Sequence, residues 1–340
     1  MASEDDLMAR AARLHYEFDL THEQVGTTLG VSRVKVTRML KKARQIGLVQ
    51  ITVMSELSLF MTMEEQLCSR FGLVKAVVVP DAVSHGRGPF SAVARGGASY
   101  LNQIVADDAV IAVGLSRTLA EIPHWLGSVS PARVRFVSLV GASRATGGGA
   151  RSPYLVTDAL ANAYCGTAEH LHAPVIVRSA TMAEELVLEP SVAEPLARAA
   201  AADAAFVGIG GIRDRADLVW SADVSRSEWA GLVAAGMVGD IAGRFFDRAG
   251  TLIDHEINHR VIGLTLDQFA AIPTRVVVAA GPAKVEPLLA AMHRQLVNVL
   301  ITDAGTAKAL LAASASGRAS ASGRASASGR ASASGSEEKS

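Results

Sequence analysis

Cysteine and net charge are both scarce in this chain, and each scarcity excludes a class of protein. Its 340 residues include only 2 cysteines. Cys68 and Cys165 show no metal-ligand spacing and are too few for a disulfide framework, so we expect two ordinary core thiols. The 33 basic and 33 acidic residues leave a formal net charge of +0. This balance excludes a general polyanion binder and confines basic character to local segments.

Long apolar runs are also absent. No apolar stretch reaches the about 18 residues that a membrane-spanning helix needs. The first residues include Glu4, Asp5 and Asp6 rather than the basic segment and apolar core of a secretory signal. We therefore expect a soluble, cytoplasmic protein that makes no membrane contact.

The last segment, from about Ser314, is low in complexity. Ser-Gly-Arg-Ala recurs there in a chain of Ala, Ser and Gly, which places an arginine at 318, 324 and 330. Such a composition has almost no apolar mass to bury, so we expect a disordered tail. An expansion of low-complexity coding sequence and weak electrostatic support for DNA binding are explanations that the composition leaves open.

Residues 21–47 have the pattern of a helix-turn-helix. Two short helical patterns are separated by Gly30, which lies where the turn of this motif often needs a positive φ. Thr21 and Ser32 are the predicted N-caps. A helix over 4–18 is expected to precede the motif, and a short strand over 48–53 could form a small wing. The apolar positions that would pack the two helices together are Val25, Leu29, Val36, Leu40 and Ala43.

The second helix of this motif carries a local basic face. Glu23 is the only acidic residue between Thr21 and Gln50. A helix in the major groove needs donors for base edges near its N-terminal end and cations for phosphates further along. We assign Arg33 and Lys35 to base contacts, whereas a solvated helical bundle with a charged face is the plainer alternative. The predicted DNA-binding residues are Ser32, Arg33, Lys35, Thr37, Arg38, Lys41 and Lys42.

The remaining chain, residues 56–313, alternates β-branched runs with helical stretches. This is the rhythm of βαβ units, so we expect an α/β domain with a mostly parallel sheet and helices on both faces. Ligands of such sheets bind beyond the carboxyl ends of the strands. The predicted strands are 76–79, 109–113, 135–140, 175–177, 205–209, 276–280 and 299–302.

A phosphate would fit the residues that follow the predicted strand 109–113. Gly114, Ser116, Arg117 and Thr118 supply a small residue, two hydroxyls and a guanidinium at the start of a helix, where amides and the helix dipole favour an anion. An ordinary strand-to-helix turn with Ser or Thr as the cap explains them equally well. Pro123 requires the helix to be short or kinked.

Two later segments could contribute to the same site. Gly281 and Lys284 follow the predicted strand 276–280 and could complete an anion site, since lysine is rare in this part of the chain. A tight turn with a solvated lysine is the alternative. Asp240 could accept hydrogen bonds from sugar hydroxyls, whereas Asp247 and Gly250 have the chemistry of a turn.

Several blocks in the same order make the chain resemble the SorC family of sugar-responsive bacterial transcription regulators, from Leu7 to about Leu311. The resemblance implies an N-terminal helix-turn-helix, an effector domain related to sugar-phosphate isomerases and deaminases, a dimer or tetramer, and DNA binding modulated by a phosphorylated sugar. The matching blocks are 31–44 with Gly47, 112–119, 139–141, 239–250, 260–264 and 298–303.

The resemblance also assigns roles by position. It implies that Ser116, Arg117 and Thr118 hold the phosphate, that Gly141 flanks the sugar, that Asp240 takes a hydroxyl and that Lys284 pairs with the phosphate. With Gly114 these are the predicted effector-binding residues. Family members that form a Schiff base need a lysine soon after strand 139–141, but the nearby basic residue here is Arg144, so we expect no covalent capture. Residues 147–149 are three glycines, and a plain flexible loop is favoured over a mobile cover.

Two motifs match catalytic or cofactor patterns only in part. His255-Glu256-Ile257-Asn258-His259 has the His-Glu-x-x-His spacing of zinc proteases, but the extended pattern fails at Ile262 and Thr265, so we expect no metal. Gly208-Ile209-Gly210-Gly211 follows a strand like a dinucleotide fingerprint, yet Arg213 occupies the position of the third glycine. A strand-end turn beside the sugar pocket is the better interpretation.

The sequence therefore predicts three segments. They are a helix-turn-helix DNA-binding domain over 1–55, a sugar-binding and oligomerisation domain over 56–313, and a tail over 314–340. The predicted function is a transcription regulator of carbohydrate metabolism, without catalytic residues or cofactor. It binds double-stranded operator DNA as a homodimer or homotetramer, under control of a phosphorylated sugar. The alternatives are an isomerase or deaminase, a regulator that responds to an unphosphorylated sugar or polyol, and an effector domain used only for assembly.

Overall fold

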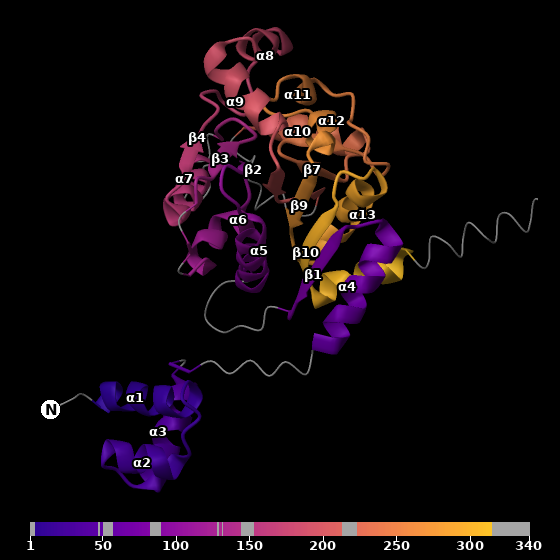
Figure 1. Ribbon diagram of the computed structural model, residues 1–340. Coiled ribbons are helices and arrows are strands. Elements are labelled where there is room, and N and C mark those ends of the chain that lie inside the picture. Colours follow the sequence, from indigo (N-terminus) through magenta and orange to yellow (C-terminus); the bar gives the residue numbers. More distant parts are fainter. Residues whose placement is uncertain are drawn as a thin grey trace, which may run out of the picture. The chain divides into compact units, whose positions relative to one another are not determined.

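The computed structural model describes residues 4–46, 48–49, 57–81, 90–127, 129–130, 132–143, 153–212 and 223–314. The chain divides into two compact units, residues 1–58 and residues 59–340 (Figure 1). Each unit is described by itself below. Several predicted features lie outside the described residues, namely Arg144, the three glycines 147–149, Arg213, positions 50–53 of the wing and the tail from 315.

The N-terminal unit is a bundle of three helices, α1 (Glu4–Tyr16), α2 (His22–Leu29) and α3 (Arg33–Gln45). The Thr21 hydroxyl accepts from the amide of Gln24, whose side chain accepts from the Thr21 amide, so α2 begins with a capping box. At α3 the Ser32 hydroxyl accepts from the Lys35 amide at 3.2 Å. Gly30 ends α2 with a φ of 66°. These contacts confirm both predicted caps and the turn glycine.

The three helices enclose a small apolar core. Met8 and Ala11 of α1 are buried in it with the predicted residues of α2 and α3. Leu29 is half-buried at the edge of the same cluster. The predicted stripe is therefore confirmed, and its fully buried members are Val25, Val36, Leu40 and Ala43.

The second unit is built on a seven-stranded sheet in which all neighbours run parallel, in the order β1-β10-β9-β5-β2-β3-β4. Because the strands share one direction, the residues after β2, β5 and β9 lie at the same edge of the sheet. The bounds are β1 (Lys75–Val79), β2 (Val110–Val113), β3 (Arg135–Ser138), β4 (Thr167–Glu169), β5 (Ala204–Val207), β9 (Thr274–Val278) and β10 (Val299–Asp303).

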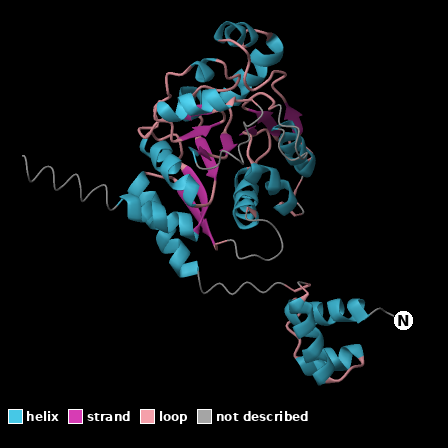
Figure 2. Ribbon diagram, turned by 180° about the vertical axis from the view of Figure 1, so that it is seen from behind, coloured by secondary structure: helices cyan, strands magenta, loops and turns pink. Residues whose placement is uncertain are grey.

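Alternate residues of the central strands face two different cores. Ala112 of β2 belongs to one buried cluster, whereas its neighbours Ile111 and Val113 belong to the other. Both faces of the sheet are therefore dry, which explains why its central strands are continuous apolar runs. Helices cover both faces (Figures 1 and 2): α5, α6 and α7 supply one core, and α4, α9, α12 and α13 supply the other.

Most helices of this unit lie between two strands along the chain. The short α6 continues into a 3-10 turn that contains Pro123, as the predicted break requires. The bounds are α4 (Leu57–Phe71), α5 (Ser91–Ile104), α6 (Arg117–Glu121), η2 (Ile122–Trp125), α7 (Pro153–Tyr164), α8 (Ala180–Leu186), α9 (Pro190–Ala200), α10 (Arg226–Ala234), α11 (Glu256–His259), α12 (Leu266–Ala271), η5 (Pro282–Lys284) and α13 (Val285–His293).

A small antiparallel sheet follows β5. It consists of β6 (Gly210–Gly211), β7 (Gly239–Ile241) and β8 (Arg244–Phe246). Ala242 and Gly243 join β7 to β8 with φ values of 52° and 78°, as a two-residue hairpin turn requires. The Arg244 guanidinium donates at 2.6–3.2 Å to the carbonyl groups of Asn258, Val261, Gly263 and Leu264.

Five strands differ from the sequence prediction, and three of them, β6, β7 and β8, make up the small sheet, which was not predicted. The predicted strand 175–177 makes only isolated bridges, with Ile176 opposite Val261, and belongs to neither sheet. Conversely, β4 is an edge strand that the sequence does not predict. Its three residues, Thr167 to Glu169, are exposed or half-buried, so no apolar run marks them.

Candidate functional site

The candidate DNA interface is the outer face of α3. The seven predicted side chains from Ser32 to Lys42 are all exposed, and the opposite face is buried in the bundle core. The α3 sequence contains no acidic residue. A helix with one anchored face and one basic face has the shape and charge that the major groove and its phosphates accept.

The candidate phosphate loop joins β2 to α6. The Ser116 hydroxyl accepts from the amides of Thr118 and Leu119, at 3.1 and 3.5 Å, and is therefore the N-cap of α6. The capping interpretation of this serine is thus confirmed. The guanidinium of Arg117 lies over the Phe90 ring, 5.0 Å from the ring centroid, which fixes its direction by a cation–π contact. Thr118 is buried.

The segment 208–211, which follows β5, is approached by Ser116, by Asp240 and by the turn that precedes Lys284. A Cβ on Gly208 would stand 2.5 Å from the Ser116 hydroxyl oxygen, and one on Gly210 would overlap the Asp240 carboxylate. A Cβ on Gly211 would stand 2.5 Å from the carbonyl oxygen of Ala283, next to Lys284. Glycine is required at each position because segments distant in sequence approach this backbone. The segment follows β5 as predicted, but its last two residues form the short strand β6 rather than a turn.

Asp240 is held in a defined position. Its side chain is buried and accepts from the Gly243 amide at 3.1 Å, across the hairpin turn. On the turn before Lys284, the amide of Gly281 donates to the Thr306 hydroxyl at 2.7 Å, and Gly281 has a φ of 108°. The Asp240 carboxylate and this turn are thus each held by a hydrogen bond within the protein.

Gly141 lies elsewhere. It follows β3, its amide donates to the Ile262 carbonyl at 2.9 Å, and a Cβ there would stand 2.6 Å from the Ala173 carbonyl oxygen. Close backbone packing therefore explains this glycine without a ligand. The structure does not bring it onto the segment 208–211.

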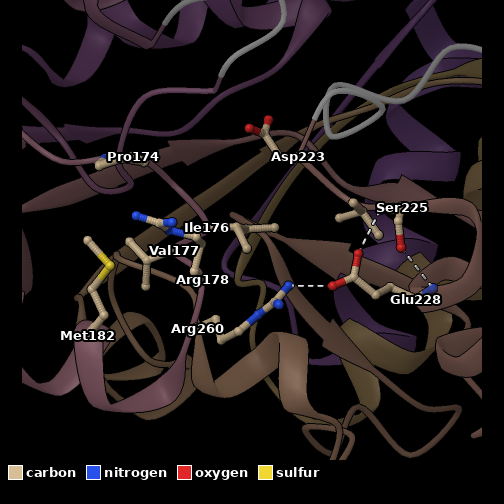
Figure 3. Close-up of a pocket in the computed structure, with 10 residues that line it drawn as sticks. Pro174, Ile176, Val177, Arg178, Met182, Asp223, Ser225, Glu228 and Arg260 are labelled. Atoms are coloured by element: carbon tan, nitrogen blue, oxygen red, sulfur yellow. Dashed lines mark hydrogen bonds and ion pairs between the residues drawn. The ribbon is translucent and has the colours of Figure 1, made fainter.

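A cavity of about 660 Å³ is lined by side chains from 174–182 and 223–228 together with Arg260, and none of its lining residues belongs to the predicted effector set. Figure 3 shows Val177, Arg178 and Met182 on one side and Ser225 and Glu228 on the other, with Arg260 reaching to Glu228. The Arg260–Glu228 ion pair measures 2.6 Å. No sequence motif marks this cavity, because its charged residues come from separate segments of the chain.

Glu228 has a double role in this cavity. It accepts from the Ser225 amide at 2.7 Å in the capping box of α10, and it pairs with Arg260. Burial raises the pKa of Glu228, but the hydrogen bonds from Ser225 and Arg260 outweigh it and hold the pKa below its usual value.

A Ser-His-Asp arrangement lies nearby. The two nitrogens of His170 lie 3.4 Å from the Ser138 hydroxyl and 2.9 Å from Asp158. Ser138 is fully buried and also bonds Thr157 at 3.2 Å. Because no substrate can reach this hydroxyl, the group forms a packed polar network rather than a nucleophilic site.

The His-Glu-x-x-His segment holds its two imidazoles apart. His255 Nδ1 accepts from the Ile257 amide as the N-cap of α11, whereas His259 Nε2 lies 3.1 Å from Asp254. Within the described residues no cluster of three metal-ligating side chains occurs. Of the two cysteines, Cys68 is half-buried, and Cys165 is exposed on a turn with a φ of 55°, so its prediction as a core thiol is wrong.

The chain is similar to a described protein family and to known transcription regulators. Residues 55–312 match the family described as "Putative sugar-binding domain". The transcriptional regulator LsrR of Enterobacter sp. (strain 638) is 35% identical over 315 residues, which cover 91% of this chain and 94% of the relative. LsrR of Klebsiella pneumoniae is 34% identical over 317 residues, covering 92% and 95%.

Solved structures agree on the fold. The full-length sorbitol operon regulator SorC from Klebsiella pneumoniae superposes with a TM-score of 0.81 at 24% identity, covering 92% of this chain and 100% of that one. The sugar-binding domain of a transcriptional repressor from Vibrio fischeri gives a TM-score of 0.68 at 28% identity, covering 75% and 99%. No helix in the described part of the chain is long and apolar enough to cross a membrane.

A helix-turn-helix unit joined to a sugar-binding α/β unit defines the class of DNA-binding transcription regulators with a carbohydrate effector. Within that class, the chain belongs to the SorC family of sugar-binding transcription regulators. The relatives named above are transcription regulators.

Proposed function

We propose that this regulator binds double-stranded operator DNA through α3, and that a phosphorylated sugar at the segment 208–211 controls the binding. The observation that carries the proposal is the convergence of Ser116, Asp240 and the turn before Lys284 on that segment. A phosphate would bind the α6 start and a sugar hydroxyl would reach the Asp240 carboxylate. An unphosphorylated sugar or polyol is the alternative ligand.

The proposed contacts with DNA are made by α3. Arg33 and Lys35, near its start, would reach base edges, whereas Arg38, Lys41 and Lys42 would neutralise phosphates. To switch DNA binding, the effector must bind the two conformations unequally, by about 1–3 kcal/mol for a typical coupling. Tight binding that is equal in both conformations would not change the affinity for DNA.

The test is fluorescence anisotropy of the protein on DNA from upstream of its own gene, at fixed salt. A panel of sugar phosphates and the matching free sugars is added in turn. A change in affinity with phosphorylated members only supports the proposal. A response to free sugars alone would mean that the effector is an unphosphorylated sugar. DNA binding that no member of the panel changes would mean that the second unit serves only in assembly.

A pair of serine variants separates ligand binding from helix capping. Ser116 caps α6, and Ser179 caps α8, where it accepts from the Met182 amide at 3.2 Å. Loss of either cap costs about 1 kcal/mol of stability. S116A is expected to weaken the response to the sugar phosphate about tenfold, by analogy with loss of a hydrogen bond to a charged group. S179A should leave the response unchanged, and an equal effect of both variants would contradict the assignment.

A further inference from the structure

Two histidines form a T-shaped ring pair in the N-terminal unit. His15 of α1 and His22, the first residue of α2, have ring centroids 4.8 Å apart at an interplanar angle of 68°. Both side chains are half-buried. His22 also contacts α3, since its Nδ1 lies 3.1 Å from the hydroxyl oxygen of Thr37.

The hydrogen bonds around this pair decide which nitrogen of each ring carries a proton. The Thr37 hydroxyl donates its single proton to the Arg33 carbonyl at 3.1 Å, so its oxygen accepts from His22 Nδ1. His15 Nδ1 lies 2.8 Å from the Leu20 carbonyl oxygen, which can only accept. Each neutral ring therefore holds its proton on Nδ1 and keeps Nε2 as the nitrogen that would take a second proton.

In the described part of the chain, Nε2 of His22 has no hydrogen-bond partner. The ring lies against the exposed Thr37, and Arg33 and Lys41 flank that residue one helical turn away on each side. Thr37 and these two cations belong to the face proposed to meet DNA. His22 is therefore in place to reach the same phosphate backbone from α2.

We propose that His22 is a DNA-phosphate contact whose Nε2 donates to a phosphate oxygen when the ring is protonated. The proposal rests on the proposed DNA-binding function. The proton comes from solvent, no covalent bond changes, and the imidazolium forms a charge-assisted hydrogen bond.

The electrostatic surroundings couple this proton to DNA. The titratable or charged groups on the elements packed around His22 are His15, Tyr16 and Arg13 on α1, Glu17 just after it, Glu23 on α2, and Arg33, Arg38 and Lys41 on α3. A phosphate oxygen that accepts from Nε2 favours the protonated ring, so DNA binding draws up to one proton per N-terminal unit. Affinity then rises as the pH falls.

The experiment measures DNA affinity by anisotropy between pH 5.5 and pH 8 at fixed salt, with the full chain and DNA from upstream of its gene. The variant is H22Q, whose side chain takes no charge in this pH range. The wild type is expected to bind roughly tenfold more tightly at pH 5.5 than at pH 8, the size of one hydrogen bond to a charged group. H22Q should match the wild type at pH 8 and lose that gain at pH 5.5.

Two controls make the outcome decisive. H15Q should keep the gain, and so should H124Q, whose histidine lies in the other unit with its side chain 68% exposed. Circular dichroism at both pH values checks that the N-terminal helices of each variant are intact. The gain should also appear on unrelated DNA, because a phosphate contact carries no sequence information.

The failures are distinguishable. No DNA binding by the wild type at any pH would overturn the proposed function itself. Binding that does not change with pH, or a gain that H22Q retains, would overturn only the role of His22. A loss of the gain in H15Q with its retention in H22Q would assign the proton to the other ring.

Discussion

Arg244 shows how one charged side chain can organise an irregular loop. Its guanidinium pairs with no carboxylate among the described residues and instead donates to four carbonyl groups between residues 258 and 264. Burial lowers the pKa of Arg244 to about 10, so the side chain is still charged at neutral pH. The planar fork of donors matches this cage, and a lysine ammonium with three donors cannot reach all four oxygens.

R244K is therefore expected to lower the free energy of unfolding by about 2–4 kcal/mol, because it leaves buried carbonyl groups without donors. Urea denaturation followed by circular dichroism measures the change. The matched control is R248K, whose side chain is 83% exposed and pairs with Glu286. That exposed pair contributes about 0–1 kcal/mol, so a loss in R248K equal to that in R244K would contradict the role of the cage.

Glu228 gives the second unit a stability that depends on pH. Its pKa is lowered in the folded protein, so the ionised side chain stabilises the fold. For a lowered carboxyl pKa this contribution is complete above the unfolded value of about 4.3 and is lost as the pH falls through the folded value. In the wild type, unfolding should become easier between about pH 5 and pH 3 in part for this reason.

E228Q should remove that part of the pH dependence and lower stability at pH 7 by about 1–3 kcal/mol, since it leaves the Arg260 guanidinium without its closest anion. Thermal unfolding at pH 7 and pH 4 measures both effects. E286Q is the control, because its ion pair is exposed. A difference between wild type and E228Q that is the same at both pH values would argue against the ionised pair.

At the scale of elements, the sequence was most informative where local physics decides the structure. The caps Thr21 and Ser32, the positive φ of Gly30 and the apolar stripe of α3 follow from side-chain chemistry and helical period, and all are confirmed. The central strands were found because a parallel sheet buried on both faces leaves continuous apolar runs. The start of α6 was also found, although its sequence could not distinguish a cap from a phosphate site.

The missed elements depend on partners far away in the chain. The apolar residues of 175–177 pack and bridge against residues near 261 instead of joining a sheet, so their β-branched character gave the wrong prediction. The edge strand β4 gains its structure from β3 alone and has no apolar pattern. The sequence predicted the turn at 208–211 beside a sugar pocket, but it could not show which segments approach this turn, because that depends on residues distant in the chain.

The residues of α3 that are proposed to contact phosphates should contribute equally to binding of any DNA sequence. R38A and K41A are each expected to weaken binding to all DNA and to flatten the dependence of log K on log salt by about 0.9, the value for one phosphate contact on B-DNA. Titrations at several salt concentrations measure this slope. E23Q, also in the helix-turn-helix, provides a comparison that removes no cation. Unchanged slopes in both cation variants would place α3 away from the phosphates.

At the scale of the whole molecule, the proposed mechanism needs more than one copy of the chain. Pairing of two helix-turn-helix units about a two-fold axis demands a palindromic operator whose half-sites are about 10 base pairs apart or a multiple of it. Footprinting of the upstream DNA locates the half-sites. Insertion of about 5 base pairs between them should weaken binding strongly, because it turns one half-site to the opposite side of the duplex, whereas about 10 should restore it. Equal binding to all three spacings would mean that the units act independently.

The crowded glycines at 208, 210 and 211 bear on how such a regulator could acquire a new ligand. Any side chain added there collides with Ser116, Asp240 or the turn at Ala283, so substitution would damage the scaffold before it altered recognition. Changes in ligand specificity must therefore arise in the segments that surround residues 208–211. A biosensor library built on this chain should keep the three glycines fixed and randomise their neighbours.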